Sequence, residues 1–133
     1  MDSDSYVTSA RAHSRITMSP ATARAIVAHE MKKGDVLGAA RYAGVQAAKE
    51  AASYLPLSDP EIVHDVTVDF TVGDSSIDVT TRVEGTTPIG ARMHALSAAT
   101  VAALTIYDMC KSADRTMQIG PVALFPPDDE AAV

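Results

Sequence analysis

The sequence predicts an α+β fold of the ferredoxin-like type, in which a four-stranded antiparallel sheet is covered by helices on one face. Three observations lead to this prediction. A chain of 133 residues and 13.9 kDa is long enough to bury one core and is expected to form one domain over residues 1–133. Two neighbouring segments alternate between apolar and polar residues, as the strands of a β-hairpin do. Alanine-rich segments with helical periodicity lie on both sides of the hairpin, so the expected order is βααββαβ.

The first elements are a short strand and a helix. Residues 15–18 are β-prone. Ser19 followed by Pro20 is typical of a helix start, because serine caps the first turn and proline fits its first position. This helix is expected to run to about Lys32 and to stop at Gly34.

The periodicity then changes from helical to strand-like. Asp35 is typical of a helix cap, and the alanine-rich segment 36–54 is expected to be helical until Pro56 breaks it. Residues 66–72 and 77–83 alternate between mainly apolar, β-prone residues and polar residues. We expect them to form a hairpin with one solvent-facing side.

The last elements are a long helix and a closing strand. After a loop at residues 85–90, the segment 93–111 is predicted to be helical and the segment 117–125 to be a strand. The polar segment 1–12 and the acidic segment 126–133 are expected to be flexible.

The charge and the cysteine count exclude several classes of function. The formal net charge is −6 and the isoelectric point is near 5.0, which argues against a nucleic acid or an anionic membrane as partner. The chain has one cysteine and four scattered histidines, so neither a disulfide nor a zinc site is expected. Neither a membrane span nor a signal peptide is recognisable. We expect a cytoplasmic protein that needs no cofactor, and one that self-associates through its alanine-rich helices.

Polar residues lie at both ends of one stripe on the third helix. From His94 to Asp108 the helix rises roughly 21 Å at about 1.5 Å per residue, too far for one small-molecule pocket. If both residues are functional, the site lies between subunits. The alternative is that Asp108 and Lys111 form an ordinary exposed ion pair. The pair of lysines that ends at Lys33 similarly fits either an anion site or simple helix capping.

Four segments of the chain resemble a known family. They are residues 33–36, 39–49, 98–111 and 119–122, and the most specific is the block from Tyr107 to Lys111. Together they resemble the MoaC family. The enzyme of that family is cyclic pyranopterin monophosphate synthase, which acts in molybdenum-cofactor biosynthesis. The resemblance implies a ferredoxin-like subunit assembled from dimers into a hexamer, with pockets between subunits. It also implies rearrangement of a cyclised, GTP-derived triphosphate with release of pyrophosphate.

The resemblance assigns three catalytic residues and reveals departures in the substrate-binding set. Two lysines and an aspartate of the family match Lys33, Asp108 and Lys111. Where the family has Cys-His-Pro, this chain has Ser58-Asp59-Pro60, and where the family has Glu-Met-Glu it has Arg92-Met93-His94. The expected substrate-binding residues are Ser58, Asp59, Arg92, Met93 and His94.

These departures leave three interpretations. Arginine and histidine mainly donate hydrogen bonds, so they fit the donor edge of a guanine or pterin ring poorly. This favours a repurposed cyclase, lyase or dehydratase of a specialised pathway, which keeps the catalytic trio for acid–base chemistry on another small molecule. The alternatives are a catalytically retired paralogue that acts as a partner subunit, and the orthodox synthase with altered ligands.

Overall fold

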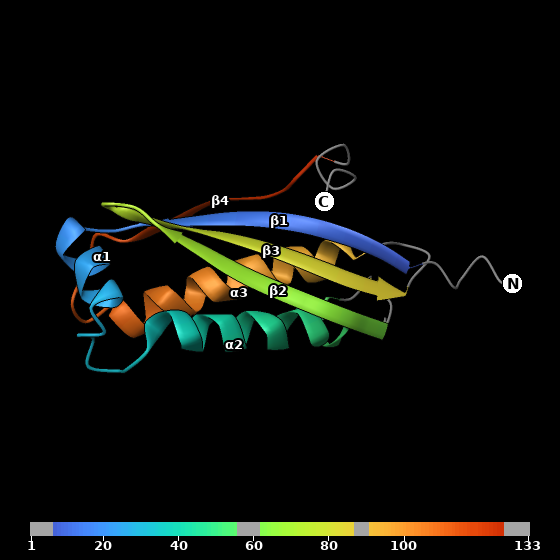
Figure 1. Ribbon diagram of the computed structural model, residues 1–133, viewed down its shortest axis with the longest axis horizontal. Coiled ribbons are helices and arrows are strands. Elements are labelled where there is room, and N and C mark those ends of the chain that lie inside the picture. The colour runs from blue at the N-terminus through green and yellow to red at the C-terminus, as the bar shows by residue number, and fades with distance from the viewer. Residues whose placement is uncertain (1–6, 56–61, 87–90, 127–133) are drawn as a thin grey trace, which may run out of the picture.

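The computed structural model describes residues 7–55, 62–86 and 91–126 (Figure 1). It confirms the predicted α+β class and the antiparallel sheet, whose four strands lie in the order β2-β3-β1-β4. This is the strand order of a ferredoxin-like fold. The elements are β1 (Val7–Thr17), α1 (Pro20–Val27), α2 (Val36–Lys49), a short 3-10 helix η1 (Ala51–Ser53), β2 (Ile62–Val72), β3 (Ser76–Thr86), α3 (Arg92–Cys110) and β4 (Gln118–Leu124).

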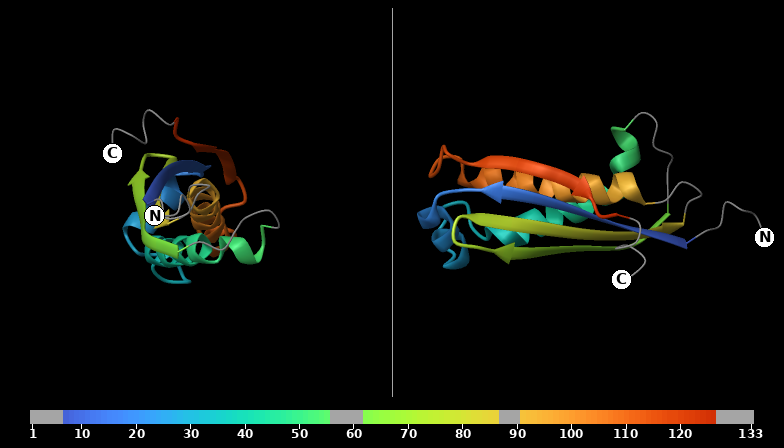
Figure 2. Two further views of the ribbon diagram at one scale, coloured as in Figure 1. Left: turned by 90° about the vertical axis from the view of Figure 1, so that its right-hand side faces the viewer. Right: turned by 90° about the horizontal axis from the view of Figure 1, so that it is seen from above.

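The two long helices, α2 and α3, lie side by side against one face of the sheet (Figure 2). Small residues make this close approach possible. A Cβ atom built on Gly44 of α2 would lie 3.1 Å from the carbonyl oxygen of Ala98 and 3.4 Å from the Cβ of Ala102, both in α3. The helices are therefore packed almost backbone to backbone at this point.

Two buried hydroxyl groups join the sheet to α3. Ser14 in β1 donates from Oγ to the carbonyl oxygen of Ala99 at 2.8 Å, and Thr81 in β3 donates from Oγ1 to that of Ala95, also at 2.8 Å. Both hydroxyl-bearing residues are fully buried. A buried polar side chain needs such a partner, so these bonds fix where α3 lies along the sheet.

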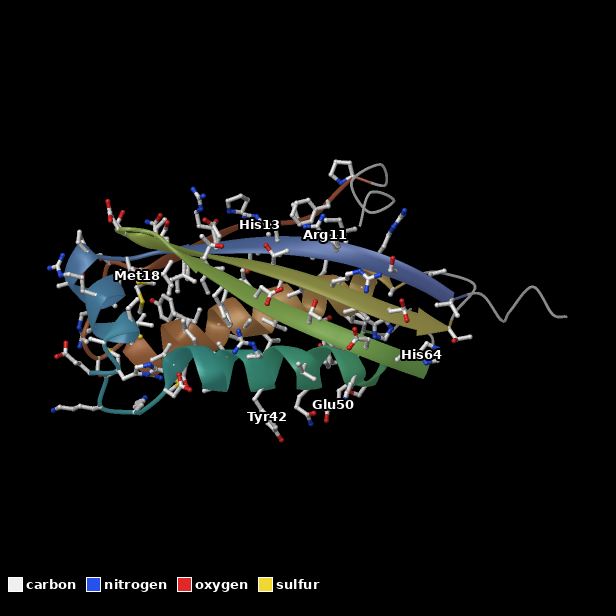
Figure 3. The ribbon with its side chains drawn as sticks, viewed as in Figure 1. Arg11, His13, Met18, Tyr42, Glu50 and His64 are labelled. Atoms are coloured by element: carbon white, nitrogen blue, oxygen red, sulfur yellow. The ribbon has the colours of Figure 1, made fainter. Side chains whose placement is uncertain are left out.

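The opposite face of the sheet is polar, as the alternation in the hairpin predicts. Figure 3 shows Arg11 and His13 on this face, whereas Tyr42 of α2 points away from the sheet on the helical side. Asp78 in β3 accepts a hydrogen bond from Nε of Arg15 at 2.7 Å and lies 3.0 Å from Nε2 of His13. The hydrogen bond from Arg15 is the main reason why the pKa of Asp78 is below its ordinary value.

The first strand is longer than the sequence predicts. The strand was expected over residues 15–18 and the segment 1–12 was expected to be flexible, but β1 begins at Val7. From there it pairs with β3 along its whole length. The reason is that Ala10 and Ala12 are buried under the helices, a role that two alanines among polar residues do not reveal.

The helix ends also differ from the prediction. Helix α1 ends at Val27 rather than near Lys32, and His29 after it has a left-handed backbone with φ of 57°. Helix α2 ends at Lys49, and the chain tightens into η1 before Tyr54. Within the described residues, no helix is both long and apolar enough to cross a membrane.

Candidate functional site

The three residues matched to the family's catalytic positions lie together at the C-terminal end of α3. Lys111 donates from Nζ to Oδ1 of Asp108 at 2.6 Å, and Nζ of Lys33 is 3.4 Å from the backbone carbonyl oxygen of Asp108. The Lys111 and Asp108 side chains are 55% and 62% exposed. Residues from two distant parts of the chain therefore meet on an accessible surface.

The two lysines keep Asp108 ionised. Its pKa is below the ordinary value, first because Lys111 donates a hydrogen bond to it, then because of the charges of Lys111 and Lys33. The C-terminal end of a helix also attracts cations, because its unpaired carbonyl groups have partial negative charge. Two ammonium groups and one carboxylate leave one net positive charge, which suits an anionic ligand.

The loop between α1 and α2 places Lys33 near α3. Gly34 has a φ of 104°, a left-handed conformation that glycine adopts easily, and it turns the chain directly after Lys33. Asp35 then caps α2, with Oδ1 accepting from the backbone N–H of Gly38 at 3.1 Å. The glycine turn and the capped helix start that directly follow Lys33 thus set the direction of the chain at this lysine.

An open cavity of about 470 Å³ adjoins this cluster and is lined by Leu104, Thr105, Tyr107, Asp108 and Lys111. Sequence reasoning did not identify Leu104, Thr105 or Tyr107 as lining residues. The signal for all three was their position on α3, since each lies three or four places before Asp108 or Lys111 and so shares a helix face with it. A larger cavity of about 570 Å³ between α1 and the turn after β2 contains none of the predicted site residues.

Arg92 and Met93 lie at the other end of α3. Both are exposed, Met93 to 44%. From Arg92 to Asp108 the helix rises roughly 24 Å, so one subunit does not bring these residues to the lysine cluster. Ser58 and Asp59 lie outside the described residues.

His94, one of the expected substrate-binding residues, is buried within the subunit. Only 2% of the residue is exposed, and Nδ1 donates to the carbonyl oxygen of Ala48 at 2.7 Å. Its ring therefore bonds the last turn of α2, where helical carbonyl groups lack partners within the helix. The described residues include no group of three or more His, Cys, Asp or Glu side chains placed to hold a metal ion.

The fold and this cluster define a ferredoxin-like α+β protein with two lysines and an aspartate grouped at the end of its long helix. The chain belongs to the MoaC family, whose sequence model matches residues 2–127.

Several curated relatives are named cyclic pyranopterin monophosphate synthase. The chain is 44% identical to the protein of that name from Geotalea uraniireducens (strain Rf4) over 118 residues, 87% of this chain and 74% of the relative. The relative from Roseiflexus sp. (strain RS-1) is 43% identical over 91% of this chain and 78% of its own length. That from Pelobacter propionicus (strain DSM 2379 / NBRC 103807 / OttBd1) is 44% identical over 86% and 72%.

Proposed function

We propose that this protein is a cyclic pyranopterin monophosphate synthase of molybdenum-cofactor biosynthesis. The sequence alone favoured a repurposed enzyme, but identities of 43–44% to synthases over most of the chain favour the orthodox reaction. The structural observation that supports it most directly is that Lys33 and Lys111 both contact Asp108. Those are the residues that the resemblance assigns to catalysis.

The cluster suits the chemistry that the resemblance implies. A triphosphate substrate and a pyrophosphate leaving group are both strongly anionic, and the ammonium groups of Lys33 and Lys111 would bind their oxygens. Asp108, held ionised by the same lysines, would keep their ammonium groups in place, and a lysine ammonium group would donate the proton that the reaction needs. The local positive charge matters because the chain has a net charge of −6, which would otherwise repel such a substrate.

The proposal includes self-association through the exposed side of α3. Leu104 is 54% exposed and Met93 is 44% exposed on this helix. An apolar cavity of about 310 Å³ lies on the same surface, lined by Tyr54, Leu55, Met93, Leu96, Ser97, Thr100 and Val101. An antiparallel copy of α3 would cover this surface and bring Arg92 of one subunit toward Asp108 of the other. Dimers built in this way, and a hexamer assembled from such dimers, would place the pockets between subunits.

A repurposed enzyme remains a second candidate because of Arg92. By the resemblance, this exposed cation stands where the family has a glutamate, so a ring edge that donates hydrogen bonds would meet another donor. The burial of His94 weakens this argument, since a buried ring offers less surface to a ligand than the sequence interpretation needs. A retired partner subunit would have no need for the trio, and no contact among the described residues favours it.

Complementation of a bacterial strain that lacks cyclic pyranopterin monophosphate synthase tests the proposal. We expect the wild-type protein to restore molybdoenzyme activity and the variants Lys33→Ala and Lys111→Ala to fail while remaining folded. Lys32→Ala is the matched control, because Lys32 is an exposed lysine next to Lys33 that lies outside the four resembling segments and should be dispensable. If the folded wild-type protein fails where the Geotalea relative succeeds, the orthodox function is wrong.

A further inference from the structure

Asp114 is a buried carboxylate that the proposed chemistry does not use. It lies just beyond α3 and is only 6% exposed. Its Oδ1 atom accepts from the backbone N–H of Thr116 at 2.8 Å and from the Thr116 hydroxyl at 2.6 Å, and its Oδ2 atom accepts from the backbone N–H of Ser19 at 2.9 Å. Every one of these contacts is a donor, so the site is built for an ionised carboxylate.

These bonds join two segments that lead to the lysine cluster. Ser19 is the N-cap residue of α1, and the loop after α1 contains Lys33. At the end of α3, the backbone N–H of Asp114 donates to the carbonyl oxygen of Cys110 at 3.1 Å. This bond adds one turn after α3, and Lys111 is part of that turn. Asp114 thus connects the end of α3 to the start of α1.

We infer that Asp114 is a positioning residue, which sets the placement of Lys33 and Lys111 around Asp108 by tying the end of α3 to the start of α1. The inference deepens the proposed function and rests on it for its kinetic consequences. Lys111 lies three residues before Asp114, within the turn that Asp114 closes. Releasing the tie would let this turn and α1 shift separately, and a small displacement of reacting groups lowers a catalytic rate steeply.

The first test is kinetic and uses two residues. Asp114→Asn keeps the shape but turns an amide N–H₂ toward donors, and Thr116→Val removes one donor without changing the charge. We expect kcat to fall about tenfold or more in Asp114→Asn, with KM changed less than about threefold, because positioning affects the reaction more than binding. Thr116→Ser retains the hydroxyl and should restore the kcat that Thr116→Val loses.

The second test does not depend on activity. Brief acetylation with acetic anhydride, read by mass spectrometry, compares Lys33 and Lys111 with the remote Lys49 in the same sample. In folded Asp114→Asn, the labelling of Lys33 and Lys111 relative to Lys49 should change by about twofold or more. The reason is that an exposed ion pair with Asp108 is too weak to hold the two lysines in place without the bonds of Asp114.

The outcomes separate the inference from the proposed function. If the wild-type enzyme is inactive on the expected substrate, the proposed function fails and the labelling experiment alone decides the role of Asp114. Unchanged labelling in the folded variants overturns the inference, and so does an unchanged kcat where the wild type is active. If Asp114→Asn does not fold, Thr116→Val and Thr116→Ser decide both measurements.

Discussion

Replacing Gly44 with alanine tests how closely α2 and α3 pack. In a helix with free space around it, this change would stabilise the protein by about 1 kcal/mol, because glycine is the poorer helix former. Gly44 has no such space. The new Cβ would lie 3.1 Å from the carbonyl oxygen of Ala98 and 3.2 Å from Cγ2 of Val68. Neither neighbour moves easily, since one is helix backbone and the other a stiff side chain in β2.

The expected result is a net loss of stability. Overpacking of this kind costs about 1–3 kcal/mol. With the gain in helix propensity set against it, we expect Gly44→Ala to lower the free energy of unfolding by about 1 kcal/mol. Such a loss lowers the melting temperature by roughly 2–6 °C in a domain of this size.

Urea unfolding at one fixed protein concentration measures the effect, because self-association would otherwise change the midpoint. Ala43→Gly is the matched control, since it reports the cost of glycine at the neighbouring, less buried position of the same helix. If Gly44→Ala proves more stable than the wild type by about the amount that Ala43→Gly loses, then α2 and α3 are not in contact at this point.

Three further predictions concern stability. Because folding holds the pKa of Asp114 well below its ordinary 3.8, its ionised form stabilises the protein above that pH and loses this effect as the pH falls. The free energy of unfolding of Asp114→Asn, measured with urea, should therefore vary less between about pH 5 and 3 than that of the wild type. Ser14→Ala removes the hydrogen bond to Ala99 and should cost about 1 kcal/mol in the same assay; no loss would mean that the bond contributes nothing. Arg41 donates from Nε to the carbonyl oxygen of Val68 in edge strand β2 at 2.9 Å. Arg41→Ala should lower stability by about 1 kcal/mol and increase aggregation measured by light scattering, and an unchanged scattering signal would rule out edge protection.

The order of elements could be predicted because its signals are local. Ser19 and Asp35 were expected to cap helices, and each accepts a hydrogen bond from the backbone N–H three residues later. The hairpin was visible as alternation, because side chains of a strand point to opposite faces in turn. These patterns need no knowledge of the rest of the chain.

The first half of β1 could not be predicted because its burial depends on distant residues. Ala10 and Ala12 are too small to mark a core-facing strand, and they are buried only because residues of α3 cover them. The end of α1 was missed for a related reason. The left-handed conformation of His29 is unusual for a residue other than glycine and has no signature in the sequence.

The candidate site was predictable only in part. Asp108 and Lys111 are three residues apart on a helix, so their contact follows from spacing alone. Lys33 lies 75 positions from Asp108, and only the family resemblance associated the two. Asp114 was missed because its role depends on Ser19, which is 95 positions away.

The arrangement of Asp108 and Lys111 depends on how α3 packs in the fold. The helix is apolar on nearly every side, a pattern found when neighbours surround a helix. Its inner side meets the sheet and α2 through alanines and through bonds from Ser14 and Thr81, which fix its position along the sheet. Its outer side leaves Leu104 exposed one turn before Asp108, so a subunit that covers this side would border the lysine cluster directly. Packing inside the subunit therefore places Asp108 and Lys111, and association between subunits would enclose them.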